Sequence, residues 1–203
     1  MILIIGCNNK NNNYKIINKS KIIKTDDCPV SISYPKIIGL GQKIKMKNLN
    51  EVLEKYPEHE SYSFLCNSNH SVKGEYEVLL KSDSILSIEF RTVIKDKKQK
   101  KSDTIYQTVV LNPNKKNDDE IRALELKDIF PNFKREIIYP FIEDYEKRNK
   151  VGINLLAYKT DSNYYITWSI SDKYLIIYAG DEGEGDGKYK IKIPMSRIKK
   201  YNK

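Results

Sequence analysis

Alternation of apolar and polar residues predicts that most of this chain of 203 residues forms β-strands. The alternating runs are short, and Gly, Pro, Asn, Asp or Ser residues punctuate them, as is typical of strands joined by turns. Pro35 is expected to close the first run, and the three runs between 74 and 111 predict a β-meander. The runs are residues 30–34, 62–66, 74–80, 85–94, 104–111, 163–170, 173–178 and 187–193.

Two segments instead show the period of a helix that buries one face. The first is expected to begin at Asn48, which can cap a helix while Glu51 reaches back, and to end before Pro57. The second covers 133–145, where Pro140 should kink or split the helix. The sequence therefore predicts one α+β domain, an antiparallel sheet with two inserted helices.

The net charge of +9 comes from the two ends of the chain. Residues 1–25 hold five lysines and 188–203 hold seven basic residues, and neither segment contains an acid. The stretch 26–187 carries 24 basic residues against 27 acids. Because nucleic-acid-binding domains usually carry positive charge on their folded body, the sequence favours solvated basic ends and no nucleic-acid partner. No apolar run approaches the length of about 18 residues that would span a bilayer.

The first seven residues resemble a bacterial lipobox, an apolar run followed by Gly6 and Cys7, which would carry the lipid. The Asn- and Lys-rich segment behind Cys7 is typical of a flexible tether. A complete signal would also have a basic start and a longer apolar stretch, and a short strand with a buried cysteine is the alternative. We expect a truncated lipoprotein signal and tether over 1–27 and a single envelope domain over 28–203.

Cysteine usage agrees with a location outside the cytoplasm. The chain has three cysteines, so a lipid on Cys7 would leave Cys28 and Cys66 as a pair. An even number of cysteines suits one disulfide in an oxidising compartment. Two buried free thiols are the alternative.

Motifs for catalysis and for cofactor binding are scarce. The only histidines are His59 and His70, and the chain has no nucleophile elbow, P-loop or complete dinucleotide fingerprint. The acidic, glycine-rich stretch 181–187 resembles a calcium loop superficially, but Ile193 stands where the closing glutamate should be. The sequence therefore predicts an acidic hairpin turn, no metal and no cofactor. A small envelope hydrolase that uses acidic residues is the alternative function.

Segments from the first and the second half of the domain together resemble an extracytoplasmic bacterial module. The most specific element is Leu-x-Leu-x-Asp-x-Phe at 124–130, and the resemblance covers about 28–201. The module forms the sensor part of the lysozyme-responsive anti-sigma-V factor and the non-catalytic part of PdaC-type peptidoglycan deacetylases. The resemblance implies an α+β fold, an envelope location and binding without catalysis. The other matching segments are 30–37, 76–78, 85–90, 165–178 and 189–194.

Two loops depart from the pattern of this module. Residues 95–103 are Lys-rich where the family usually has an aromatic, glycine-rich segment with a histidine. Residues 180–187 are acidic and glycine-rich where the family often has a Pro-Tyr-Ala-like turn. Because partner contacts would be expected in these loops, lysozyme binding does not carry over to this chain.

We therefore expect a lipid-anchored envelope protein whose domain binds a protein or a peptidoglycan or other glycan ligand. The acidic loop would favour a cationic protein partner, and packing within a sheet is the alternative role of the aromatic candidates. A basic-ended nucleic-acid-binding domain is a more remote alternative. The candidate contact residues are Tyr164, Tyr165, Trp168, Asp181, Glu182, Glu184 and Asp186.

Overall fold

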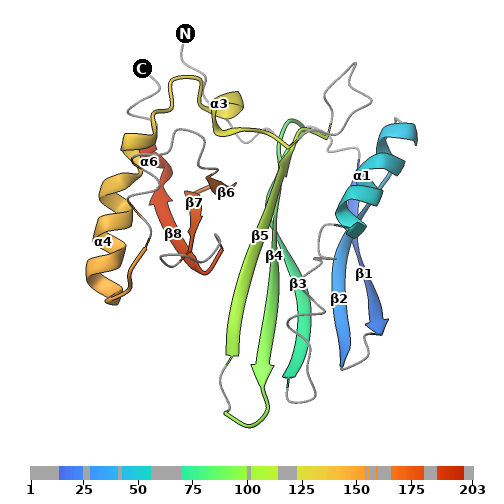
Figure 1. Cartoon of the computed structure of the whole chain (residues 1–203). Coiled ribbons are helices and arrows are strands. Elements are labelled where there is room, and N and C mark those ends of the chain that lie inside the picture. Colours follow the sequence, from blue (N-terminus) through green and yellow to red (C-terminus); the bar gives the residue numbers. More distant parts are fainter. Residues whose placement is uncertain are drawn as a thin grey trace.

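The computed structural model describes residues 14–24, 28–40, 43–55, 70–99, 102–113, 123–153, 155, 159, 166–180 and 187–198. These residues form two β-sheets and a few helices, which confirms the predicted α+β class (Figure 1). Within the described segments, no helix is both long and apolar enough to cross a membrane.

The larger sheet has five strands in the order β1-β2-β3-β4-β5. All neighbours are antiparallel except β2 and β3, which run parallel and pair only over 30–32 and 72–74. The parallel pair arises because a long connection containing helix α1, Lys43–Lys55, separates these two strands in the chain. The meander β3-β4-β5 is confirmed. The strands are β1 Lys15–Lys24, β2 Pro29–Ile38, β3 His70–Lys81, β4 Leu86–Asp96 and β5 Ser102–Leu111.

The smaller sheet is antiparallel and has the order β6-β7-β8. Its strands are Thr167–Ile170, Tyr174–Ala179 and Tyr189–Pro194, which confirms the predicted hairpin and last strand. The predicted split at Pro140 is also confirmed, because Pro140 lies in the first turn of a new helix, where its missing N–H is tolerated. The helices are α3 Leu126–Ile129, the 3₁₀ helix η1 Arg135–Ile137, α4 Tyr139–Asn149 and α6 Met195–Ile198.

Strand β4 separates two hydrophobic clusters because its side chains alternate between the faces of the large sheet. Ile88 and Phe90 pack with Leu49 and Leu53 of α1 on one face. The other face packs against the small sheet, whose own cluster extends to Ile142 of α4. Figure 1 shows α1 on one side of the large sheet and the small sheet with α4 on the other.

The prediction of a tether over 1–27 is wrong for residues 15–24, which form strand β1. Strand β1 pairs with β2 in an unbroken register from Lys15 opposite Ile38 to Lys24 opposite Pro29. An edge strand tolerates many lysines because much of it faces solvent. Four of the five lysines of the basic amino-terminal segment are therefore part of the folded sheet.

Two other local predictions are also wrong. Pro35 does not end β2, which continues to Ile38. Strand β3 pairs with β2 only as far as Ile32, so the N–H group that Pro35 lacks is not needed for a hydrogen bond to β3. Helix α1 begins at Lys43, so Asn48 lies within the helix and does not cap it. The predicted strand over 62–66 lies outside the described residues.

Candidate functional site

The structure describes only one of the predicted contact residues, and it places that residue in the core. Trp168 is 4% exposed and packs in the cluster between the small sheet and its helices. Its carbonyl accepts a hydrogen bond from the Thr108 hydroxyl at 2.7 Å, which fixes β6 against β5. The prediction that Trp168 contacts a ligand is therefore wrong. Six further candidates lie outside the described residues: Tyr164, Tyr165, Asp181, Glu182, Glu184 and Asp186.

Cys28 is disulfide-bonded, and its side chain is buried beside Val30, Ile32 and Val72. The other two cysteines of the chain, Cys7 and Cys66, lie outside the described residues. The pairing with Cys66 and the lipid on Cys7 therefore remain predictions.

A buried carboxylate lies between the two sheets. Glu89 of β4 is fully buried, and its Oε2 accepts a hydrogen bond from the Tyr178 hydroxyl of β7. The same oxygen lies 2.6 Å from Lys190 Nζ of β8, so the charge is compensated. Ser169 Oγ lies 2.8 Å from the Tyr178 hydroxyl. Burial raises the pKa of Tyr178 above its ordinary value, and the Glu89 charge raises it further, so this side chain remains a neutral donor.

This Glu89 cluster has the properties of a structural link. Glu89, Tyr178 and Ser169 are all fully buried, so a ligand in solution cannot reach them. Other polar contacts reinforce the same contact area between the sheets. Tyr106 N–H donates to Gly187 O at 2.8 Å, and Ile170 N–H donates to Ser87 Oγ at 3.1 Å. The Glu89 cluster therefore offers no surface to a ligand.

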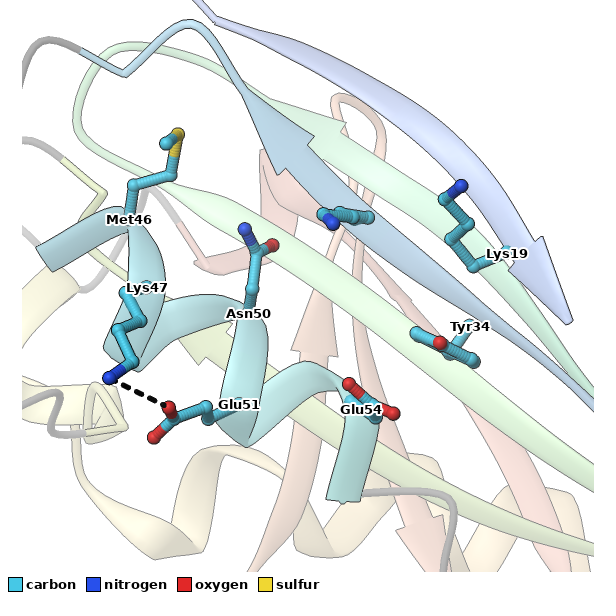
Figure 2. A pocket seen from close by; sticks show the side chains of 8 residues that line it. Lys19, Tyr34, Met46, Lys47, Asn50, Glu51 and Glu54 are labelled. Carbon is cyan, nitrogen blue, oxygen red and sulfur yellow. Dashed lines mark ion pairs between the residues drawn. The ribbon is translucent and has the colours of Figure 1, made fainter. Parts of the chain in front are cut away.

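A groove with a volume of about 490 Å³ opens between α1 and the strand pair β1-β2 (Figure 2). One wall consists of strand side chains and the other of helix side chains spaced three or four residues apart. The lining residues are Lys19, Tyr34, Lys36, Met46, Lys47, Asn50, Glu51 and Glu54.

Asn50 fixes the helix wall of the groove against β2. Its Oδ1 accepts a hydrogen bond from Ile37 N–H at 2.7 Å, and its Nδ2 donates to Ile37 O at 2.9 Å. On this side of β2, strand β3 pairs only with residues 30–32 and does not reach Ile37. Asn50 therefore supplies the hydrogen bonds that a neighbouring strand would otherwise make.

The strand wall carries lysines on both sides of a half-buried tyrosine. The register of β1 and β2 places Lys19 directly opposite Tyr34, and Lys36 follows two residues later on the same face. Lys21 Nζ lies 5.2 Å from the centre of the Tyr34 ring and 3.7 Å from the Glu54 carboxylate. The ion pair between Lys21 and Glu54 therefore lies next to the Tyr34 ring, which also lines the groove.

Sequence reasoning missed this groove because its parts are distant in the chain and look unremarkable separately. The lysines of 1–25 suggested a solvated end, and α1 was expected to start five residues later than it does. Residues 15–24 contain four isoleucines but no regular alternation of apolar and polar positions, so the pattern did not identify β1. Among the described residues, no cluster of His, Cys, Asp or Glu could hold a metal ion.

Comparison with known proteins shows the fold but no sequence family. No family model matches the chain, and no curated protein does. The chain is similar to the crystal structure of a member of the DUF3298 family from Bacteroides fragilis, with a TM-score of 0.51 and 14% identity over 93% of this chain and 94% of that chain. A DUF3298 family protein from Pseudomonas aeruginosa PAO1 gives a TM-score of 0.48 and 10% identity over 92% of each chain.

The Bacteroides structure shows that this chain has a single α+β domain, mostly antiparallel, of the kind found in DUF3298 proteins. That family is a domain of unknown function, so the likeness assigns no activity. The finer resemblance to the anti-sigma-V factor and to PdaC-type deacetylases remains a prediction.

Proposed function

We propose that this chain is a lipid-anchored, non-catalytic binding domain of the cell envelope, and that a cell-wall glycan occupies the groove between α1 and β1-β2. The observation that carries the proposal is the groove itself, a concave site where an aromatic ring adjoins amide, lysine and glutamate side chains. Its volume of about 490 Å³ falls in the range of ligand pockets, roughly 300–1,000 Å³. The disulfide at Cys28 supports an oxidising compartment.

The groove favours a glycan over a cationic protein as the ligand. A protein partner usually needs an extended surface of roughly 800 Å² on each side. The lining also contains three lysines against two glutamates, which does not attract a basic protein. The acidic loop that suggested such a partner lies outside the described residues.

The carboxylates of the groove support binding without catalysis. Glu51 lies 3.8 Å from Lys47, and Glu54 lies 3.7 Å from Lys21. A hydrolytic pair needs two carboxylates that flank one bond and act on it, whereas each of these glutamates is engaged by a lysine.

Co-sedimentation with purified peptidoglycan sacculi tests the glycan ligand. We expect the protein to pellet with sacculi, and Tyr34→Ala to lower the bound fraction because it removes the ring from the strand wall. Tyr174→Ala, a matched change on the small sheet away from the groove, should leave binding unchanged. Thermal unfolding would establish that both variants fold. Absence of binding by the unaltered protein would contradict the proposal, and salt-dependent capture of lysozyme in its place would indicate a protein partner.

The lipid anchor needs a separate test, on protein expressed from its own upstream region. We expect mass spectrometry of the intact protein to give the mass of a lipid-modified chain that starts at Cys7. We also expect the protein to partition into the membrane fraction. An unmodified chain in the soluble fraction would contradict the envelope location and leave the groove proposal to be judged by ligand binding alone.

A further inference from the structure

We infer that the groove is specific for an acidic ligand, whose carboxylate or phosphate group is held jointly by Lys19 and Lys36 beside the Tyr34 ring. The inference rests on the proposed function, because it names the chemical class of ligand for the same groove. It arises from the register of β1 and β2 and from the distribution of charge along the two walls.

Lys19 and Lys36 are close enough to bind one acid group. Lys19 is directly opposite Tyr34, so Lys36 occupies the diagonal position across the strand pair. Diagonal neighbours on one face of an antiparallel pair are about 7–8 Å apart, which long side chains can bridge. Figure 2 shows both strands facing the helix wall, with Lys19 on β1 and Tyr34 on β2.

These two lysines supply the charge of the groove that is not compensated. The helix-wall glutamates are already engaged, Glu51 by Lys47 and Glu54 by Lys21. Within the part of the chain that the structure describes, no carboxylate lies within ion-pair distance of Lys19 or Lys36, and both residues are exposed. Two like charges on one sheet face repel each other, and a bound anion removes that repulsion.

The rest of the groove suits the non-ionic part of such a ligand. The half-buried ring of Tyr34 lies next to Lys19 in register, and Met46 of α1 adds a flexible apolar side chain to the lining. A sugar ring that carries an acidic substituent matches this order of groups, with its ring against Tyr34 and its acid between the lysines. A neutral glycan would leave the two lysines without a partner.

Titration calorimetry with three soluble probes tests the inference. The probes are a muramic-acid-containing disaccharide that bears a carboxylate, the neutral disaccharide of N-acetylglucosamine, and a glycerol-phosphate oligomer that bears phosphodiesters. We expect at least one acidic probe to bind about 10-fold more tightly than the neutral disaccharide at low salt, and this advantage to shrink at high salt. The acidic probe that gains more identifies the source of the acid group.

Charge-removing variants then locate the effect. Lys19→Gln and Lys36→Gln should each weaken binding of the acidic probe about 3-fold, and together they should reduce it to the level of the neutral probe. Lys24→Gln removes the same charge from the opposite face of β1 and should change neither affinity. Equal affinity for acidic and neutral probes, or equal losses for both in the variants, would overturn the inference while the proposed function stands. Failure of every probe and of sacculi to bind would overturn both.

Discussion

Tyr178 of the small sheet donates its hydroxyl proton to the carboxylate of Glu89 in the large sheet, and both side chains are fully buried. The two residues are 89 positions apart in the chain, so this bond exists only when the sheets have docked. Lys190 of β8 adds a charge contact at 2.6 Å to the same carboxylate oxygen. Strands β4, β7 and β8 thus meet at one buried polar cluster, which defines how the two sheets dock.

The first prediction concerns this cluster. We expect Glu89→Gln and Tyr178→Phe each to lower the free energy of unfolding by about 1–3 kcal/mol. Glu89→Gln removes the charge that faces Lys190 and weakens the bond from Tyr178, and Tyr178→Phe takes the hydroxyl donor from the buried carboxylate. The double variant should lose less than the sum of the two, because both changes act on the same contact. Urea denaturation monitored by the fluorescence of the buried Trp168 gives all three values.

Glu77→Gln is the matched control for that experiment. Glu77 lies on β3 and is half exposed, and it lies 3.8 Å from Arg91. An exposed ion pair of this kind contributes less than about 1 kcal/mol. Losses at Glu89 no larger than the loss at Glu77 would contradict a structural role for the buried cluster.

The cluster also shows what the sequence pattern can and cannot predict. Alternation in 85–94 located β4, because Ile88 and Phe90 face a core that any sheet must have. The same alternation assigns Glu89 to a solvent-facing position, whereas the second sheet covers that face. Alternation within a strand reveals its two faces but not which of them another sheet will cover.

The groove was unpredictable for a related reason. The β1 segment holds four lysines and follows an Asn-rich stretch, so its composition suggested a tether although every residue from Lys15 to Lys24 pairs with β2. Its place beside the groove depends on helix α1, which begins only at Lys43, and on the hydrogen bonds between Asn50 and Ile37. Local patterns do not encode such contacts between distant segments.

The second prediction concerns the approach of the main chains of the two sheets at Gly187. This glycine has φ of 112°, and a β-carbon there would lie 2.5 Å from the carbonyl oxygen of Tyr106. We expect Gly187→Ala to lower the free energy of unfolding by about 2–4 kcal/mol, through backbone strain and this clash. Gly152→Ala is the control, because no atom lies within 4 Å of the added carbon, and its effect should be within about 0.5 kcal/mol. Similar values for the two variants would refute close main-chain packing at Gly187.

The third prediction concerns alkaline pH. Burial raises the pKa of Tyr14 from 10.0 to about 12, and the nearby Asp83 charge acts in the same direction. The unfolded chain therefore loses this proton at a lower pH than the folded chain. The contribution of the Tyr14 hydroxyl to the free energy of unfolding is fully present below pH 10 and is lost between pH 10 and 12. Tyr14→Phe should be less stable near neutral pH, because it loses the hydrogen bond to Ser82 O at 3.2 Å. Its unfolding free energy should fall less steeply with pH.

Urea titrations at several pH values up to 11 measure both slopes. All other ionisable groups are present in both proteins, so the difference in slope reports Tyr14 alone. Parallel pH profiles for the two proteins would contradict the raised pKa.

The last prediction concerns the partner of Cys28, and it also bears on the lipid anchor. Cys28 is disulfide-bonded, and only Cys7 and Cys66 are available within the chain. We expect peptide mapping without reductant to recover a Cys28–Cys66 link. Reduction, or Cys66→Ser, should lower the free energy of unfolding by roughly 3–4 kcal/mol, whereas Cys7→Ser should have no effect. A Cys7–Cys28 link would contradict both the pairing and the lipoprotein proposal, because a cysteine in a disulfide has no thiol left to carry a lipid.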